Sequence, residues 1–173
     1  MNYETSSTKP REFLSLTGST PEEFKALLPH FREALSACPY TLEGKQRQKP
    51  GTAYSNSPLP TVEDKLFFIL VYFKQYPTQS YLGSSFGMTQ PKANLWIHYL
   101  SPVLQNALST AALSPAREAD ELADEPGSLF SHDGTERPIQ RPTTGQKAYY
   151  SGKKKTHTVK NNVLANEDCA VIF

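Results

Sequence analysis

The chain has 173 residues, of which 38% are apolar and 20% are charged. This length suits one ordinary domain or two small ones, and the composition is that of a folded protein with a modest core. No stretch of 18 uncharged apolar residues occurs, which excludes a transmembrane helix, and the polar segment 1–11 does not resemble a signal peptide. Only two cysteines are present, which fits reduced thiols, so we expect a cytoplasmic protein.

The net charge of +1 hides a strong segregation of charge along the chain. Residues 116–136 contain seven acidic residues and one basic residue, whereas residues 137–160 contain seven basic residues and no acidic one. Such a basic block predicts a surface for anions or nucleic acid, and a solvated basic hairpin is the alternative. We take Lys153, Lys154 and Lys155 as its DNA-binding candidates.

The first half of the chain predicts helices. Residues 1–18 are expected to be a polar lead-in, followed by a helix that begins after Thr20 and ends before Pro39. A second helix, apolar on nearly all sides, begins after Thr61. Between these helices, residues 43–58 form a loop whose basic residues suit either an arm along a phosphate backbone or a solvated linker.

Residues 78–100 carry the most informative pattern. Thr78 caps a short helix, Gly83 is small where two helices must approach, and Gly87 can take the left-handed conformation that ends a helix. Thr89 then caps a second helix, which we expect to kink or restart at Pro102. The apolar face of this second helix consists of Ala93, Trp96, Ile97 and Leu100. This order predicts a helix-turn-helix, with a plain antiparallel helical pair as the alternative.

A helix-turn-helix places its second helix in the major groove of DNA. We expect the exposed start of this helix to present Thr89, Gln90, Lys92 and Asn94 to a duplex. Amide side chains can contact the edge of adenine, and lysine can contact a guanine edge or a phosphate. These four residues are therefore predicted to bind DNA.

The second half of the chain changes character. Residues 114–127 are acidic and rich in proline, as expected of a linker, and strands are predicted over 129–136, 153–164 and 169–173. The expected fold class is therefore α+β. An all-α helix-turn-helix domain over 20–113 precedes the linker, and a three-stranded unit over 128–173 follows it.

Two segments of this second half resemble a known family. Residues 131–142 (SHDGTERPIQRP) and 146–164 (QKAYYSGKKKTHTVKNNVL) resemble the start of the catalytic domain of DDE-superfamily transposases encoded by bacterial insertion sequences. Residues 59–104 resemble the helix-turn-helix that precedes this domain. The resemblance implies an RNase H-like fold for the strand unit, with Asp133 as a catalytic residue and metal ligand. It also implies two Mg²⁺ ions that promote attack on DNA phosphodiesters.

The sequence differs from this family because it lacks suitable residues for the second and third acidic positions of the catalytic triad. Only 40 residues follow Asp133, and Glu167 and Asp168 are expected in a turn, where neither suits the remaining positions of the acidic triad. One carboxylate is too few for two ions. We therefore expect an incomplete catalytic domain that does not bind Mg²⁺ tightly, although the complete family enzyme uses two ions.

The expected function is that of a transposase or transposase fragment that binds double-stranded DNA at insertion-sequence ends without cutting it. A non-catalytic DNA-binding regulator or inhibitor of transposition is the alternative. A homodimer, or pairing with the product of a downstream reading frame, is the expected protein contact, because three strands without covering helices leave an open sheet edge. The expected location is the nucleoid of a bacterial cytoplasm.

Overall fold

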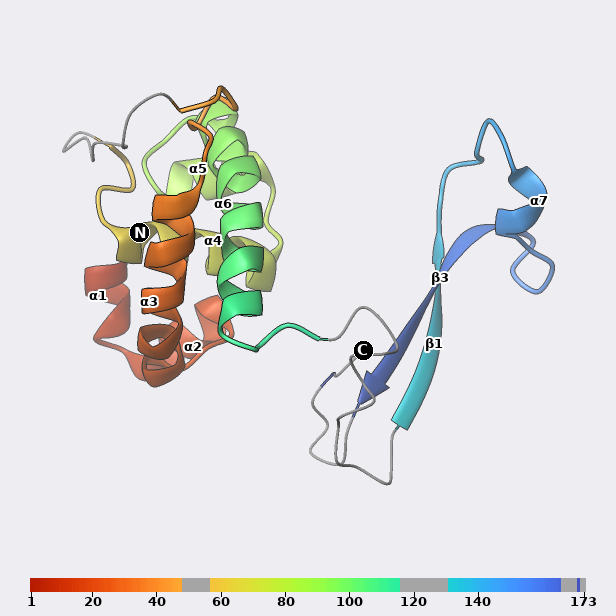
Figure 1. The fold of residues 1–173 in the computed structure, drawn as a ribbon, viewed down its shortest axis with the longest axis horizontal. Helices are drawn as coiled ribbons and strands as arrows, with labels where there is room; N and C mark the ends of the chain where they lie inside the picture. The colour runs from red at the N-terminus through yellow and green to blue at the C-terminus, as the bar shows by residue number, and fades with distance from the viewer. Residues whose placement is uncertain (48–56, 116–130, 166–170, 172–173) are drawn as a thin grey trace. The chain divides into compact units, whose positions relative to one another are not determined.

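The computed structural model describes residues 1–47, 57–115, 131–165 and 171, and the chain divides into two compact units, Met1–Leu113 and Ser114–Phe173 (Figure 1). The described residues form seven helices and one three-stranded antiparallel sheet, which agrees with the predicted α+β class. None of the described helices is long and apolar enough to cross a membrane.

The first unit, here called the helical unit, contains six helices. They are α1 (Tyr3–Ser7), α2 (Pro10–Thr17), α3 (Pro21–Ala37), α4 (Val62–Gln75), α5 (Gln79–Ser85) and α6 (Gln90–Thr110). At the starts of α3, α4 and α5, the hydroxyl groups of Thr20, Thr61 and Thr78 accept hydrogen bonds from backbone N–H groups of the first turn. Such caps satisfy N–H groups that have no partner inside the helix. They explain why these helices begin where the sequence predicts.

Two prolines lie inside helices instead of ending them. Helix α3 continues past Pro29, and α6 runs as one element past Pro102, so of the predicted kink or restart at Pro102 the restart does not occur. Proline removes one helical hydrogen bond. Buried residues before and after each proline pack against the core, and this packing stabilises the helix across the proline. Val103, Leu104 and Ala107, which follow Pro102, are all buried.

The prediction of a polar lead-in over residues 1–18 was wrong. This segment forms α1 and α2, and Phe13 is fully buried. The ring centroid of Phe13 lies 5.3 Å from that of Phe24 and 5.6 Å from that of Phe67. The backbone N–H of Tyr3 also donates to Asp64 at 3.0 Å. Aromatic packing of this kind stabilises short helices that local sequence alone would not predict.

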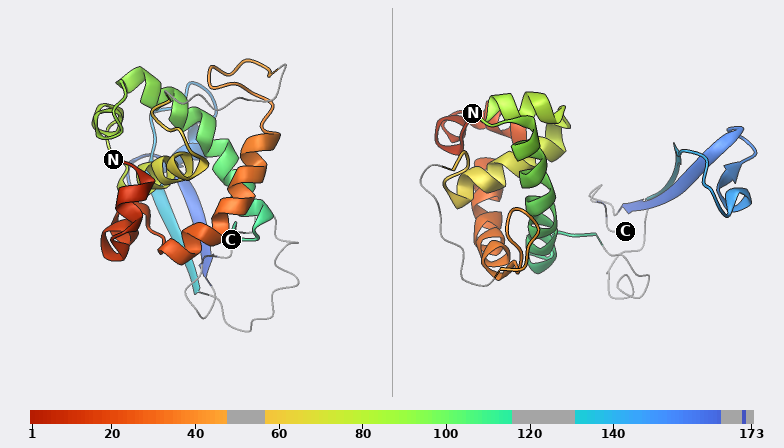
Figure 2. Two further views of the ribbon diagram at one scale, coloured as in Figure 1. Left: turned by 90° about the vertical axis from the view of Figure 1, so that its left-hand side faces the viewer. Right: turned by 90° about the horizontal axis from the view of Figure 1, so that it is seen from above.

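The core of the helical unit lies between α3, α4 and α6. Helices α3 and α6 run antiparallel and side by side, and α4 lies across them (Figures 1 and 2). The residues that α4 buries are Asp64, Leu66, Phe67, Phe68, Ile69 and Val71, which cover most sides of the helix as predicted. This core fixes the position of α6, and α5 packs against α6 in turn.

The second unit, here called the sheet unit, contains β1 (Ser131–Pro138), α7 (Gln146–Tyr149), β2 (Tyr150–Ser151) and β3 (Thr156–Ala165). The strand order is β1-β3-β2, with every pairing antiparallel. Asp133 lies opposite Val163, and Glu136 lies opposite Lys160. The first two predicted strands therefore exist, shifted at their ends by a few residues.

The third strand of this sheet differs from the prediction. A turn is indicated at Ser151 and Gly152 by the sequence, but Tyr150–Ser151 pairs with β3, and α7 was not predicted. The predicted strand over 169–173 lies outside the described residues except for Val171, which forms an isolated bridge with Ala165. Most of the predicted acidic linker, from residue 116 onward, also lies outside them. An RNase H-like sheet stays a prediction.

Candidate nucleic-acid interface

The turn between α5 and α6 depends on two glycines. A Cβ atom at Gly83 would lie 2.8 Å from the carbonyl oxygen of Met88, a distance that real Cβ atoms do not tolerate. Gly87 has a φ of +68°, in the left-handed region that glycine favours. The N–H of Met88 donates to the carbonyl of Gly83 at 2.8 Å and closes the turn. Both glycine roles that the sequence predicted are confirmed.

The same turn places α6 with one face in the core. Its buried residues are Ala93, Trp96, Ile97, Leu100, Val103, Leu104 and Ala107. This face matches the prediction and continues it by two turns. At the start of α6 the opposite face is exposed to solvent, as a groove-binding helix requires.

The predicted DNA-binding residues at the start of α6 do not share one side. Successive helical residues are about 100° apart, so Gln90 and Asn94 lie on the same side, whereas Lys92 and Asn94 are about 160° apart. Thr89 and Gln90 are exposed, and Lys92 and Asn94 are half-buried. Gln90 and Asn94 are thus grouped on one flank of α6, and Lys92 lies on the other flank.

Thr89 occupies the N-cap position of α6, as predicted. Its backbone is extended, with φ −75° and ψ 156°, but its hydroxyl makes no capping hydrogen bond. An exposed hydroxyl at a helix start is suited to a phosphate oxygen, since protein side chains of this type commonly position a duplex through its backbone. Thr89 therefore remains a candidate contact.

Three further residues near the start of α6 were not predicted. Leu95 and His98 are exposed on the outermost stripe of α6, four and seven residues after Pro91. Gln79, in the first turn of α5, accepts a hydrogen bond from the Nε2 of Gln90 at 2.6 Å. The helical period could have indicated Leu95 and His98, whereas the contact between Gln79 and Gln90 depends on how the turn folds.

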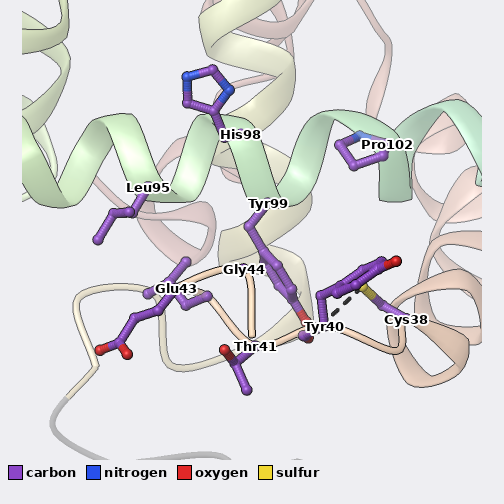
Figure 3. A pocket seen from close by; sticks show the side chains of 10 residues that line it. Cys38, Tyr40, Thr41, Glu43, Gly44, Leu95, His98, Tyr99 and Pro102 are labelled. Carbon is purple, nitrogen blue, oxygen red and sulfur yellow. Dashed lines mark hydrogen bonds between the residues drawn. The ribbon is translucent and has the colours of Figure 1, made fainter. Parts of the chain in front are cut away.

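A short hairpin, residues 39–47, stands beside the later turns of α6. Tyr40 and Gln46 form an antiparallel bridge, and the hairpin is joined to α6 by a hydrogen bond from Arg47 to the Tyr99 hydroxyl at 2.9 Å. A cavity of about 340 Å³ lies between them (Figure 3). Its lining includes Tyr40 and Glu43 from the hairpin and Leu95, His98, Tyr99 and Pro102 from α6.

This hairpin changes the interpretation of the predicted basic arm. Arg47 holds the hairpin to Tyr99, and Lys45 is exposed with its Nζ 3.5 Å from a carboxylate oxygen of Glu43. Burial raises the pKa of Tyr99; the nearby Cys38 adds to this, and Arg47 opposes it. Lys49 lies outside the described residues. Of the described arm residues, Lys45 is therefore exposed but lies beside a carboxylate.

Lys153, Lys154 and Lys155 form the exposed turn between β2 and β3. The turn is held from within by Ser151, whose backbone carbonyl accepts from the N–H of Lys155 at 2.8 Å. The Ser151 hydroxyl is buried and donates to Glu136 at 2.8 Å. The three lysines thus share one rigid turn with their side chains in solvent, which suits a phosphate backbone.

Asp133 lies on β1 as predicted and is exposed to solvent. Among the described residues, no three His, Cys, Asp or Glu side chains gather where they could hold a metal ion. Glu136 lies three residues along the strand, and Ser151 and Lys160 already contact it. The described residues therefore do not fit the two-ion centre that the family resemblance implies, because such a centre needs several carboxylates.

Comparison with known proteins agrees with this geometry. Residues 57–110 match the family model described as the helix-turn-helix of DDE superfamily endonuclease. The chain is 28% identical over 132 residues to a probable transposase for insertion sequence element IS702 from Microchaete diplosiphon. The match covers 75% of this chain and 45% of that protein, so the chain spans about half the length of its relative. No solved structure is significantly similar to it. Residues 57–110 of the helical unit are thus similar to the helix-turn-helix of DDE-superfamily endonucleases, and the chain is similar to part of a probable insertion-sequence transposase.

Proposed function

We propose that this chain binds the ends of an insertion sequence as the DNA-binding part of a DNA transposition system. The observation that carries the proposal is the start of α6, where polar side chains are exposed directly after a glycine-dependent turn. The N-terminal residues of such a helix contact base edges in the major groove. The similarity to the transposase helix-turn-helix supports the same assignment.

The residues of α6 divide into two roles under this proposal. Gln90 and Asn94 share the side that faces base edges, and their amides suit adenine. Lys92 lies on the flank and contributes to affinity through a phosphate, without selecting a sequence. Lys153, Lys154 and Lys155 add a second set of phosphate contacts from the sheet unit.

The test is the affinity of the chain for duplex DNA that carries the ends of its own insertion element. Asn94→Ala should weaken binding by about 1–3 kcal/mol, chiefly on the native sequence, since one base contact is lost. Lys92→Ala should weaken binding to all sequences and reduce the salt dependence by about one phosphate contact. Fluorescence anisotropy at several salt concentrations measures both effects.

Two matched variants serve as controls. Asn106→Ala changes the same residue type on an exposed position near the other end of α6, and Lys25→Ala removes an exposed lysine from α3. Both should leave binding unchanged. Equal affinities for Asn94→Ala and Asn106→Ala would contradict the assignment of the α6 start to the groove.

A second candidate function is a non-catalytic regulator that occupies insertion-sequence ends. The observation in its favour is the lone exposed Asp133, which lacks carboxylate neighbours within the described part of the chain. Under this proposal the purified chain binds the ends but does not cut them with Mg²⁺, and Asp133→Ala changes nothing in a gel-based cleavage assay. Cleavage by the chain that requires Mg²⁺ and is lost in Asp133→Ala would overturn it.

The sheet unit supports a proposal about protein partners. Strand β1 pairs with β3 on one side, and the described residues provide no partner on its other side. An open strand edge is a template for another chain, so we propose pairing there with a second copy or with a downstream-frame product. Light scattering of the chain alone and with that product tests this, and a monomer in both samples would contradict it.

A further inference from the structure

We propose that Gln79 and Gln90 act as one unit that recognises a single adenine in the major groove. This inference rests on the proposed DNA-binding function and names a specificity-determining residue, Gln79, outside the second helix. It concerns the hydrogen bond that joins the first turns of α5 and α6.

The contact has the geometry of a strong side-chain hydrogen bond. The Nε2 of Gln90 donates to the Oε1 of Gln79 at 2.6 Å, across 11 positions of the sequence. Gln90 is exposed and Gln79 is half-buried, so the pair lies at the surface where both helices begin. Both helix starts therefore meet at the end of the motif that approaches DNA.

The donors and acceptors that remain on Gln90 match adenine. A glutamine amide has two N–H donors and one carbonyl acceptor, and the bond to Gln79 uses one N–H. The other N–H can donate to N7 of adenine, and the carbonyl can accept from its N6 amino group. The contact with Gln79 thus leaves the pair of groups that a bidentate contact with adenine requires.

Gln79 also fixes which way the amide of Gln90 is turned. A free glutamine side chain rotates and loses that freedom on binding, whereas a tethered one has already lost part of it. With the amide held, its carbonyl would face the O6 acceptor of guanine, and two acceptors repel. The tether therefore favours adenine over guanine, while the two N–H donors of Gln79 remain for a phosphate oxygen.

The pair is not needed to hold the two helices together. The turn is already closed by the bond from Met88 to Gly83, and Leu82 and Phe86 anchor α5 in the core. A polar contact at the surface adds little to such an arrangement, because water competes for both amides. Its position at the duplex-facing end indicates recognition as its role.

The experiment begins with duplexes that the wild-type chain selects from a random-sequence pool. Affinity is then measured on the selected site and on sites in which each base pair is replaced in turn. At one position of the site, Gln90→Ala should reduce the preference for adenine over the other bases by roughly 5- to 150-fold, the range for one bidentate contact. Gln79→Ala should lose part of the same preference, and the double variant should be no worse than Gln90→Ala alone.

A conservative variant separates positioning from phosphate binding. Gln79→Glu keeps an acceptor for Gln90 but removes the N–H donors and adds a negative charge, so it should keep the adenine preference and bind all sequences more weakly. Asn106→Ala serves as a control that changes neither. Thermal unfolding of each variant shows whether the helical unit remains folded.

The outcomes distinguish this inference from the proposed function. Absence of DNA binding by the wild-type chain would overturn both. Normal binding with an unchanged adenine preference in Gln90→Ala, or with independent additive effects of the two variants, would overturn the glutamine pair alone. A fall in thermal stability without a change in base preference would assign the pair a structural role and also overturn it.

Discussion

The helical unit and the sheet unit are stabilised by different means. The helical unit buries an aromatic cluster in which Phe13, Phe24 and Phe67 are fully removed from solvent. In the sheet unit, the buried side chains among the described residues are Ser151 and Thr158, both polar. Burial of apolar area is the main source of folding stability. Side-chain packing therefore stabilises the helical unit, whereas the sheet unit depends mainly on backbone hydrogen bonds between its strands.

This difference follows from the sequences of the two units. Helix α4 has apolar residues on most of its sides, whereas β1 contains no large apolar residue and leaves nearly every side chain exposed. Sheets of few strands need an apolar face or a packed helix for independent stability. We therefore expect the helical unit to remain folded under conditions in which the sheet unit opens.

The largest expected effect comes from removing a core ring. Phe67→Ala should destabilise the helical unit by about 3–5 kcal/mol, because the buried ring leaves a cavity between α2 and α4. The matched change in the sheet unit, Val163→Ala, should cost less than about 1 kcal/mol, since this side chain is exposed. Hydrogen exchange of backbone amides measures both units at once, and equal losses would contradict the comparison.

The glycines provide a second, smaller contrast. Gly83→Ala should destabilise the helical unit by about 1–3 kcal/mol and weaken DNA binding, because the new Cβ meets the carbonyl of Met88 and displaces α6. Gly152→Ala is the control in the sheet unit, where no heavy atom lies within 4 Å of the added carbon. Chemical denaturation and anisotropy give the two readouts. Normal DNA binding by a folded Gly83→Ala variant would argue against the turn geometry.

The smallest expected effect concerns pH. Burial raises the pKa of Tyr99 above the ordinary value of 10.0, so the folded chain keeps this proton at a pH where the unfolded chain has lost it. The stability from this group is complete below pH 10 and falls as the pH rises through the folded pKa. Tyr99→Phe should show a shallower loss of stability above pH 10 in denaturation experiments.

The same substitution at Tyr150, an exposed residue of the sheet unit, is the control for that experiment. It should leave the alkaline slope of the helical unit unchanged. If Tyr99→Phe lost stability above pH 10 as steeply as the wild-type chain, ionisation of Tyr99 would not be the cause of that loss.

Helix starts and turns could be predicted because their causes are local. The capping threonine at position 20 with Glu23, and the glycine at 87, act on neighbours within four residues. Helix α2 also begins at Pro10 and ends at Gly18, whose φ is +75°, so local signals for it were present and were not used in the prediction. Its packing through Phe13 on Phe67 depends on residues far along the chain. Strand β2 has two residues and exists through its pairing with β3, which no local pattern indicates.

The candidate site divides in the same way. Gln90 and Asn94 follow from the order of turn and helix, and the helical period alone is enough to separate Lys92 from them. Gln79 enters the site through a contact across the folded turn, so it is invisible in the linear sequence. The grouping of carboxylates around Asp133 depends on tertiary structure, and the described residues do not provide it.

The hairpin over residues 39–47 limits how far α6 can enter a groove. Helix α6 has 21 residues and a length of about 30 Å, yet from Leu95 to Pro102 its outer side borders the cavity beside the hairpin. Under the proposed function, contact with bases is confined to the tip of α6, which spans only a few base pairs. Such a tip reads too little sequence to select one site in a genome, so recognition of a terminus would require more than one such module.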